Sequence, residues 1–183
     1  SDLVAYGNYA GSNSNNTTPV QGLRRMVPGL VWTKGCDMAS NNTSGFAAAV
    51  LAAKQAKVTI TVFGIDGSQE HETGTRTIIT LPGVQEQLLE EISATGTKLI
   101  LVLIGGSAMA VPNWQHRADA IVIAGYGGEE AGTGLADVIF GAYNPAGRLP
   151  YTVPTGLGQL PPFENYQMDR GSCGEAACGR TYR

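Results

Sequence analysis

Three short, almost uninterrupted runs of apolar residues constrain the fold of this chain more than any other feature of its sequence. They span residues 58–63, 99–104 and 120–124 and are rich in β-branched side chains. A strand with one exposed face alternates apolar and polar residues, whereas a strand of a parallel sheet is covered on both faces and is apolar throughout. The three runs are therefore predicted to be buried strands of a parallel sheet.

Segments with helical periodicity separate these runs. A helix is predicted after Ser44, which can cap its first turn. Its apolar face is predicted to consist of Phe46, Val50 and Leu51. Two further helices are predicted at residues 84–96 and 129–141, and residues 147–153 resemble a short strand in which Pro150 marks an edge. Alternation of strands and helices predicts an α/β fold with helices on both faces of the sheet.

The charge balance excludes two classes of partner. Twelve basic and fifteen acidic residues give a net charge of −3, with no basic cluster of the kind that binds nucleic acid or an anionic membrane. No apolar stretch approaches the ~20 residues that a membrane-spanning helix needs. We therefore expect no nucleic-acid partner and no membrane partner.

Cysteines and sequons indicate the compartment. Cys173 and Cys178 lie in a Gly/Ala-rich segment, where they could form a small disulfide ring or remain free thiols; the spacing leaves both open. Two polar, turn-like segments carry Asn-x-Ser/Thr sequons, with candidate acceptors at Asn15, Asn16, Asn41 and Asn42. Together these features favour a secreted or vacuolar protein. The two histidines lack the spacing of zinc ligands, so no metal site is expected.

Ligands of parallel α/β sheets bind beyond the carboxyl ends of the strands, which directs attention to residues 64–76, 105–112 and 125–134. The glycines of the third segment do not form a Gly-x-Gly-x-x-Gly motif. Glu129 and Glu130 would also repel a phosphate at the start of the following helix. No Gly-x-Ser-x-Gly motif indicates a serine hydrolase. A nucleotide site and a serine nucleophile are therefore both disfavoured.

The segment 64–76 is the best candidate for chemistry. It carries the carboxylates of Asp66, Glu70 and Glu72, and ends in Arg76. Carboxylates can act as general acid or base, with a cation that orients them or tunes their pKa. A solvated surface loop can have the same composition, and spacing alone leaves both interpretations open.

Several segments resemble one family. Residues 64–83 are similar to the glycoside hydrolase family 3 segment Gly-Leu-Asp-x-Ser-Gln-Glu-x-Glu-x-x-Asp-Arg followed by Leu-Pro-Gly. Further matches to this family of β-glucosidases and β-xylosidases follow in the family's order, at residues 7–11, 18–23, 124–141, 144–150 and 179–183. The resemblance covers nearly the whole chain, and the ordered matches make it specific.

The resemblance implies a fold and a mechanism. In this family the second domain is an α/β sandwich, a mostly parallel sheet between helical layers, packed against an N-terminal barrel. A barrel aspartate attacks the anomeric carbon of a terminal β-linked sugar, and a glutamate of the second domain protonates the leaving oxygen and then activates water. Carried over by position, Glu70 is the acid/base candidate and Glu72 the second choice. Asp66 and Arg76 are supporting, substrate-binding residues, and no cofactor is implied.

The chain also departs from the family. Thr75 and Gly127 stand where the family has Asp and Pro, and Glu129 replaces a Gln. The barrel with its aspartate has no counterpart, and the family's first strand is expected before Ser1. We therefore expect a single domain over residues 1–183 that is inactive alone. Its expected partners are a β-linked sugar and either a barrel domain or a second copy of the chain.

Two other interpretations remain open. The chain could be a non-catalytic sugar-binding or inhibitory protein that uses the inherited loops, or a proteolytic remnant without activity. Sugar titration and the intact mass of natural material would separate these interpretations.

Overall fold

A parallel sheet forms the centre of the part of the molecule that the structure describes. The computed structural model describes residues 15–73 and 76–160. Its strands are β1 (Val58–Gly64), β2 (Lys98–Ile104) and β3 (Ala120–Ile123), in the order β1-β2-β3. Both strand pairs are parallel. The three strands predicted from the apolar runs are confirmed.

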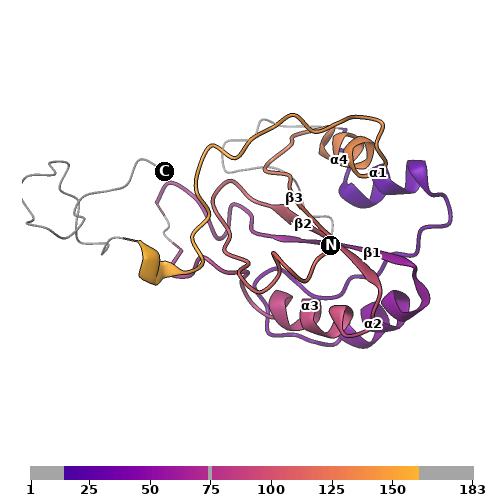
Figure 1. Cartoon of the computed structure of the whole chain (residues 1–183), viewed down its shortest axis with the longest axis horizontal. Helices are drawn as coiled ribbons and strands as arrows, with labels where there is room; N and C mark the ends of the chain where they lie inside the picture. Colours follow the sequence, from indigo (N-terminus) through magenta and orange to yellow (C-terminus); the bar gives the residue numbers. More distant parts are fainter. Residues whose placement is uncertain (1–14, 74–75, 161–183) are drawn as a thin grey trace, which may run out of the picture.

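Helices cover both faces of this sheet, which confirms the predicted α/β sandwich. The helical elements are α1 (Pro19–Met26), α2 (Phe46–Gln55), α3 (Gln85–Ser93), α4 (Ala131–Ile139) and the 3₁₀ turn η1 (Leu157–Gln159). Figure 1 shows α1 and α4 on one side of the sheet and α2 and α3 on the other. α1 packs on α4, and α2 packs on α3.

The core explains why the strands are almost uninterruptedly apolar. Leu99, Leu101 and Leu103 of β2 belong to a buried cluster with α2 and α3. The alternate residues Val102 and Ile104 pack in a second cluster with α4. Successive side chains of a strand point to opposite faces, and here each face meets a helical layer. The register continues this pattern across the sheet in the row Val62, Val102 and Val122.

The predicted face of α2 is wrong in part. Gly45 precedes the helix without a side-chain cap, and the N–H of Ser44 is instead bound by Asn42 Oδ1 at 2.9 Å. Phe46 is buried as predicted, but Leu51 is 57% exposed. The buried residues at helical spacing are Phe46, Ala49 and Ala53. Ala49 and Ala53 are small and only weakly hydrophobic, so the sequence pattern favoured the larger Leu51 instead.

The predicted strand at residues 147–153 is also wrong. This segment has no regular secondary structure, and Leu149 within it is 50% exposed. Pro150 has no backbone N–H to donate, and none of the described strands pairs with this segment. Its apolar residues alone were not sufficient to form a strand.

The helix α1 was not predicted, although its start carries a recognisable signal. The backbone N–H of Gln21 donates to the Thr18 hydroxyl at 3.3 Å, and the Gln21 side chain accepts from the Thr18 N–H at 2.8 Å. This reciprocal pair is a capping box, and Pro19 in the first turn suits a helix start.

Candidate active site

The loops that follow β1, β2 and β3 meet at the carboxyl edge of the sheet. Glu70, in the loop after β1, is hydrogen-bonded to Gly106 after β2 and to Tyr126 after β3. The hydroxyl of Tyr126 also lies 3.4 Å from the carbonyl oxygen of Ile65. Parallel strands bring their carboxyl ends together, and this edge is where α/β sheets place their ligands.

Both carboxylate oxygens of Glu70 accept hydrogen bonds. Oε1 accepts from the backbone N–H of Gly106 at 2.5 Å and from the hydroxyl of Tyr126. Oε2 accepts from the hydroxyl of Ser107. Gly106 allows this close approach, because a Cβ there would lie 2.7 Å from the Tyr126 ring and 3.0 Å from Glu70 Oε1. Hydrogen bonds to a charged acceptor are the stronger class, so the Glu70 carboxylate is firmly anchored.

These contacts set the protonation states of both partners. Burial raises the pKa of Glu70, but the hydrogen bonds from Ser107, Tyr126 and Gly106 and the charge of Arg76 outweigh it, so the pKa lies below its ordinary value. Burial and the Glu70 carboxylate raise the pKa of the Tyr126 phenol. At neutral pH Glu70 is therefore an anion and Tyr126 a neutral donor.

Arg76 is linked to Glu70 through Ser107. Its Nη2 donates to Ser107 Oγ at 2.8 Å and to the carbonyl oxygen of Ala108 at 2.8 Å. Two buried atoms of the same loop, Arg76 Nη1 and Gln69 Oε1, have no hydrogen-bond partner among residues 15–73 and 76–160. Buried polar atoms are rarely left without a partner, and both of these lie in the candidate site.

The other predicted residues have different environments. Asp66 shapes the turn: its Oδ1 accepts from the N–H and the hydroxyl of Ser68, at 2.8 and 2.6 Å. Its carbonyl oxygen accepts from the N–H of Glu70 at 3.0 Å. Glu72 is exposed and takes no part in the hydrogen bonds that hold Glu70. The structure thus brings Glu70 and Arg76 together, uses Asp66 to support the backbone, and leaves Glu72 accessible.

Tyr126, Ser107 and Gly106 are site residues that sequence reasoning did not single out. They lie 56, 37 and 36 residues from Glu70 along the chain, so no local motif contains them. The predicted order of parallel strands did point to their segments, residues 105–112 and 125–134, but it gave no reason to choose these residues within them.

The remaining sequence predictions are partly outside the structure. Cys173 and Cys178 lie outside the described residues, so their pairing stays a prediction. The four sequon asparagines lie in irregular segments, all exposed, and their glycosylation also stays a prediction. Among the described residues no group of His, Cys, Asp and Glu is arranged to hold a metal ion. None of the described helices has the length and apolar character needed to cross a bilayer.

Comparison with known proteins places these loops in context. The sequence profile described as "Glycosyl hydrolase family 3 C-terminal domain" matches residues 2–182. The chain is 42% identical over 118 residues to a periplasmic β-glucosidase of Salmonella typhimurium, a match covering 64% of this chain and 15% of the relative. It is 40% identical over 149 residues to β-D-xylosidase 1 of Arabidopsis thaliana, covering 80% and 19%. The chain therefore spans less than a quarter of the length of these relatives.

Solved structures agree with the sequence matches. A family 3 exo-β-xylosidase in complex with a xylobiose aziridine probe superposes with a TM-score of 0.76 at 34% identity, covering 84% of this chain and 20% of the other. The family 3 β-glucosidase of Bifidobacterium adolescentis superposes with a TM-score of 0.79 at 28% identity, covering 90% and 25%. With the profile match over nearly its whole length, the chain belongs to glycosyl hydrolase family 3 and corresponds to that family's C-terminal domain.

Proposed function

We propose that this chain supplies the acid/base part of a retaining β-glycosidase site and does not complete the reaction alone. The observation that carries the proposal is the loop after β1, where two glutamates and an arginine lie at the ligand-binding edge of the sheet. The matched relatives are named as β-glucosidases and β-xylosidases, so a terminal β-linked glucose or xylose is the proposed substrate class.

A retaining mechanism needs a second carboxylate as nucleophile, about 5–5.5 Å from the acid/base carboxyl group. The resemblance assigns the nucleophile to an aspartate of a barrel, and this chain matches only 15% and 19% of the length of two longer relatives. A barrel-bearing polypeptide is therefore the proposed partner.

The two glutamates are suited to different parts in this proposal. A general acid at neutral pH needs a raised pKa, whereas the contacts of Glu70 lower its pKa. Glu72 is exposed and two residues away from Glu70, on the side of the loop that stays open to a docked barrel and a bound sugar. We therefore favour Glu72 as the proton donor and Glu70 as the residue that fixes the loop, which reverses the order that the sequence resemblance implied.

The test uses the full 183-residue chain with aryl β-glucosides and β-xylosides. Alone it is expected to give no turnover. Mixed with the N-terminal part of a family 3 relative, truncated where the match to this chain begins, it is expected to restore hydrolysis. Turnover by the isolated chain that Glu72→Gln and Glu70→Gln both abolish would overturn the claim of inactivity.

The same mixture assigns the glutamates. Loss of a general acid lowers the rate by roughly 10²–10⁴ for poor leaving groups, and by much less for a leaving group that needs no proton. We expect this dependence on the leaving group for Glu72→Gln, and for Glu70→Gln a loss of similar size with every leaving group. Glu91→Gln, exposed on α3, is the matched control. If Glu70→Gln alone shows the dependence on the leaving group, Glu70 is the acid.

A further inference from the structure

The loop after β1 contains the pair Asp66–Gly67, and no other aspartate or asparagine of the chain is followed by glycine. In a peptide, the backbone nitrogen that follows an aspartate can attack the carboxyl carbon of that aspartate. Glycine makes this attack easiest, because it has no Cβ to obstruct its nitrogen or to restrict its backbone. The family segment that this loop resembles has no fixed residue at the position of Gly67, so the pair is a property of this chain.

The side chain of Asp66 is already turned toward Gly67. Its Oδ1 accepts from the N–H of Ser68 at 2.8 Å and from the hydroxyl of Ser68 at 2.6 Å. The first of these bonds folds the carboxyl group back over the peptide group between Asp66 and Gly67, as in an Asx turn. Both bonds donate to an oxygen on which negative charge grows when the carboxyl carbon is attacked, and such donors stabilise that charge.

The remaining groups that the attack needs are accessible. Among residues 15–73 and 76–160, no hydrogen bond engages the N–H of Gly67 or Oδ2 of Asp66. Both residues are partly exposed, so water reaches them. The attacking nitrogen, the leaving oxygen and the water are therefore all present at this turn.

Two backbone hydrogen bonds oppose the attack. The carbonyl oxygen of Asp66 accepts from the N–H of Gln69 at 2.9 Å and from that of Glu70 at 3.0 Å. The attack rotates the peptide group of Asp66, so these bonds have to open. Hydrogen bonds of a partly exposed loop open far more often than the whole fold does, because no core has to be broken. Local opening is thus sufficient.

We propose that Asp66 and Gly67 form a modification site at which the folded chain converts the aspartate to isoaspartate through a cyclic imide. The nitrogen of Gly67 forms a bond to Cγ of Asp66. The protonated oxygen of the carboxyl group leaves with the proton of that nitrogen, as water. A second water then opens the imide. Addition at Cγ breaks the new bond and restores aspartate, whereas addition at the main-chain carbonyl carbon breaks the original peptide bond and leaves isoaspartate.

Isoaspartate changes the backbone that positions Glu70. The main chain then runs through Cβ and Cγ of residue 66 and is one methylene longer. The carbonyl group that accepted from the N–H groups of Gln69 and Glu70 becomes a free carboxylate on a branch. The bonds of Glu70 to Gly106, Ser107 and Tyr126 should therefore be lost, which gives the site a limited lifetime. The cost in activity rests on the proposed function, whereas the modification itself does not.

The test incubates the full chain in its native state at pH 5 for several weeks and then digests it with trypsin. Cleavage after Lys57 and Arg76 releases the peptide 58–76, in which Asp66 is the one aspartate and asparagine is absent. We expect a second chromatographic form of this peptide with unchanged mass, which is the isoaspartate. A minor form lighter by one water is the imide.

The same digest contains an internal control, and two variants locate the chemistry. Asp119 is exposed but precedes Ala120, so the peptide 118–148 that contains it should remain a single form. Gly67→Ala obstructs the attacking nitrogen and should slow the conversion by roughly tenfold or more. Asp66→Asn keeps an Oδ1 acceptor and forms the same imide with loss of ammonia, so its peptide should gain mass even if Gly67→Ala fails to fold.

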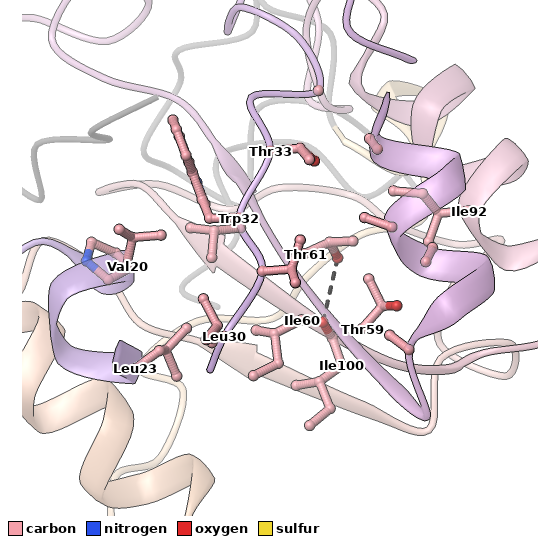
Figure 2. A pocket seen from close by; sticks show the side chains of 18 of the residues that line it. Val20, Leu23, Leu30, Trp32, Thr33, Thr59, Ile60, Thr61, Ile92 and Ile100 are labelled. Atoms are coloured by element: carbon pink, nitrogen blue, oxygen red, sulfur yellow. Dashed lines mark hydrogen bonds between the residues drawn. The ribbon is translucent and has the colours of Figure 1, made fainter. Parts of the chain in front are cut away.

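Tryptophan emission shows whether the chain stays folded during the incubation. Figure 2 shows Trp32 and Leu30 along a cavity of about 710 Å³ beside β1, and none of residues 64–76 lines this cavity. Trp114, the second tryptophan, is 1% exposed in the core. A change confined to the loop should leave the emission unchanged, whereas unfolding would shift it to the red. Conversion that appears only together with a red shift would overturn the proposal.

NMR measures the effect on Glu70. The N–H of Gly106 donates to Glu70, so the incubated chain should show a second Gly106 amide resonance whose intensity follows the fraction of isoaspartate. A single, unchanged resonance in the converted chain would overturn the proposed loss of the Glu70 contacts. No conversion in the native chain, or equal conversion in Gly67→Ala, would overturn the site itself. No sugar or glycosidase assay enters this test, so its failure leaves the proposed function untouched.

Discussion

Ser107 joins the two charges of the candidate site, because its hydroxyl donates to Glu70 and accepts from Arg76. This relay holds the carboxylate and the guanidinium near each other without a direct ion pair between them. The sequence could place Glu70 and Arg76 on one loop but could not reveal the relay. Ser107 and Tyr126 reach Glu70 because the three strands are parallel neighbours in the sheet, which local sequence patterns do not encode.

Tyr126→Phe tests how much this anchoring contributes. Loss of the hydroxyl removes one donor to a carboxylate that is partly accessible to water, so we expect a loss of about 1 kcal/mol of stability at pH 7. The pKa of Glu70 should rise, which carboxyl NMR titration would measure. Tyr143→Phe, 61% exposed, is the control.

The pH dependence of this variant follows from the direction of the shift. A carboxylate whose pKa is lowered on folding adds stability that is present above its unfolded pKa and is lost as the pH falls through the folded one. Tyr126→Phe should therefore lose less stability than the natural chain between pH 7 and pH 3. An equal loss would show that the hydroxyl does not lower the pKa of Glu70.

At the scale of elements, the sequence predicts the buried face of a helix correctly where large apolar residues form that face. Leu88, Leu89 and Ile92 of α3 are buried as their spacing predicts, and the helix ends before Gly96, which has a φ of +77°. The face of α2 was misjudged because its buried residues include small alanines. Helix α1 was missed because few large apolar residues mark it: its buried residues are Pro19, Gly22 and Leu23.

Substitutions at the crossing of α1 and α4 test the contact between these two helices. A Cβ at Gly22 would lie 1.9 Å from the carbonyl oxygen of Gly132, and a Cβ at Gly132 would lie 2.0 Å from that of Thr18. Because these obstacles are backbone atoms, Gly22→Ala should force the helices apart and destabilise the fold by about 2 kcal/mol or more. Urea unfolding would measure the loss.

A second glycine of α4 provides the control. A Cβ at Gly134 meets nothing within 4 Å, so Gly134→Ala should stabilise the chain by up to about 1 kcal/mol through helix propensity. If Gly22→Ala proved as harmless as Gly134→Ala, the two helices would not be in the close contact described.

At the scale of the molecule, Gln85 connects parts that belong to different layers. From α3 its amide bonds both backbone groups of Gly64 at the end of β1 and the carbonyl oxygen of Met38 at 2.7 Å. It is 2% exposed. The sequence placed Gln85 at the start of a helix but gave no reason to bury it, because its partners are set by tertiary structure alone.

Gln85→Leu should therefore destabilise the whole fold rather than a single helix. It leaves three buried backbone groups without partners, for a loss of about 3 kcal/mol in urea unfolding, while Gln87→Leu, exposed on the same helix, should change little.

Gln85→Glu sharpens the test. Its carboxylate would be buried against two carbonyl oxygens, so folding should raise its pKa. A raised pKa gives stability that is present below the unfolded pKa of about 4.3 and is lost as the pH rises through the folded one. The free energy of unfolding of Gln85→Glu, taken relative to that of Gln85→Leu, should thus be smaller at pH 8 than at pH 5. A constant difference between the two variants would mean that the residue 85 side chain is not held between β1 and Met38.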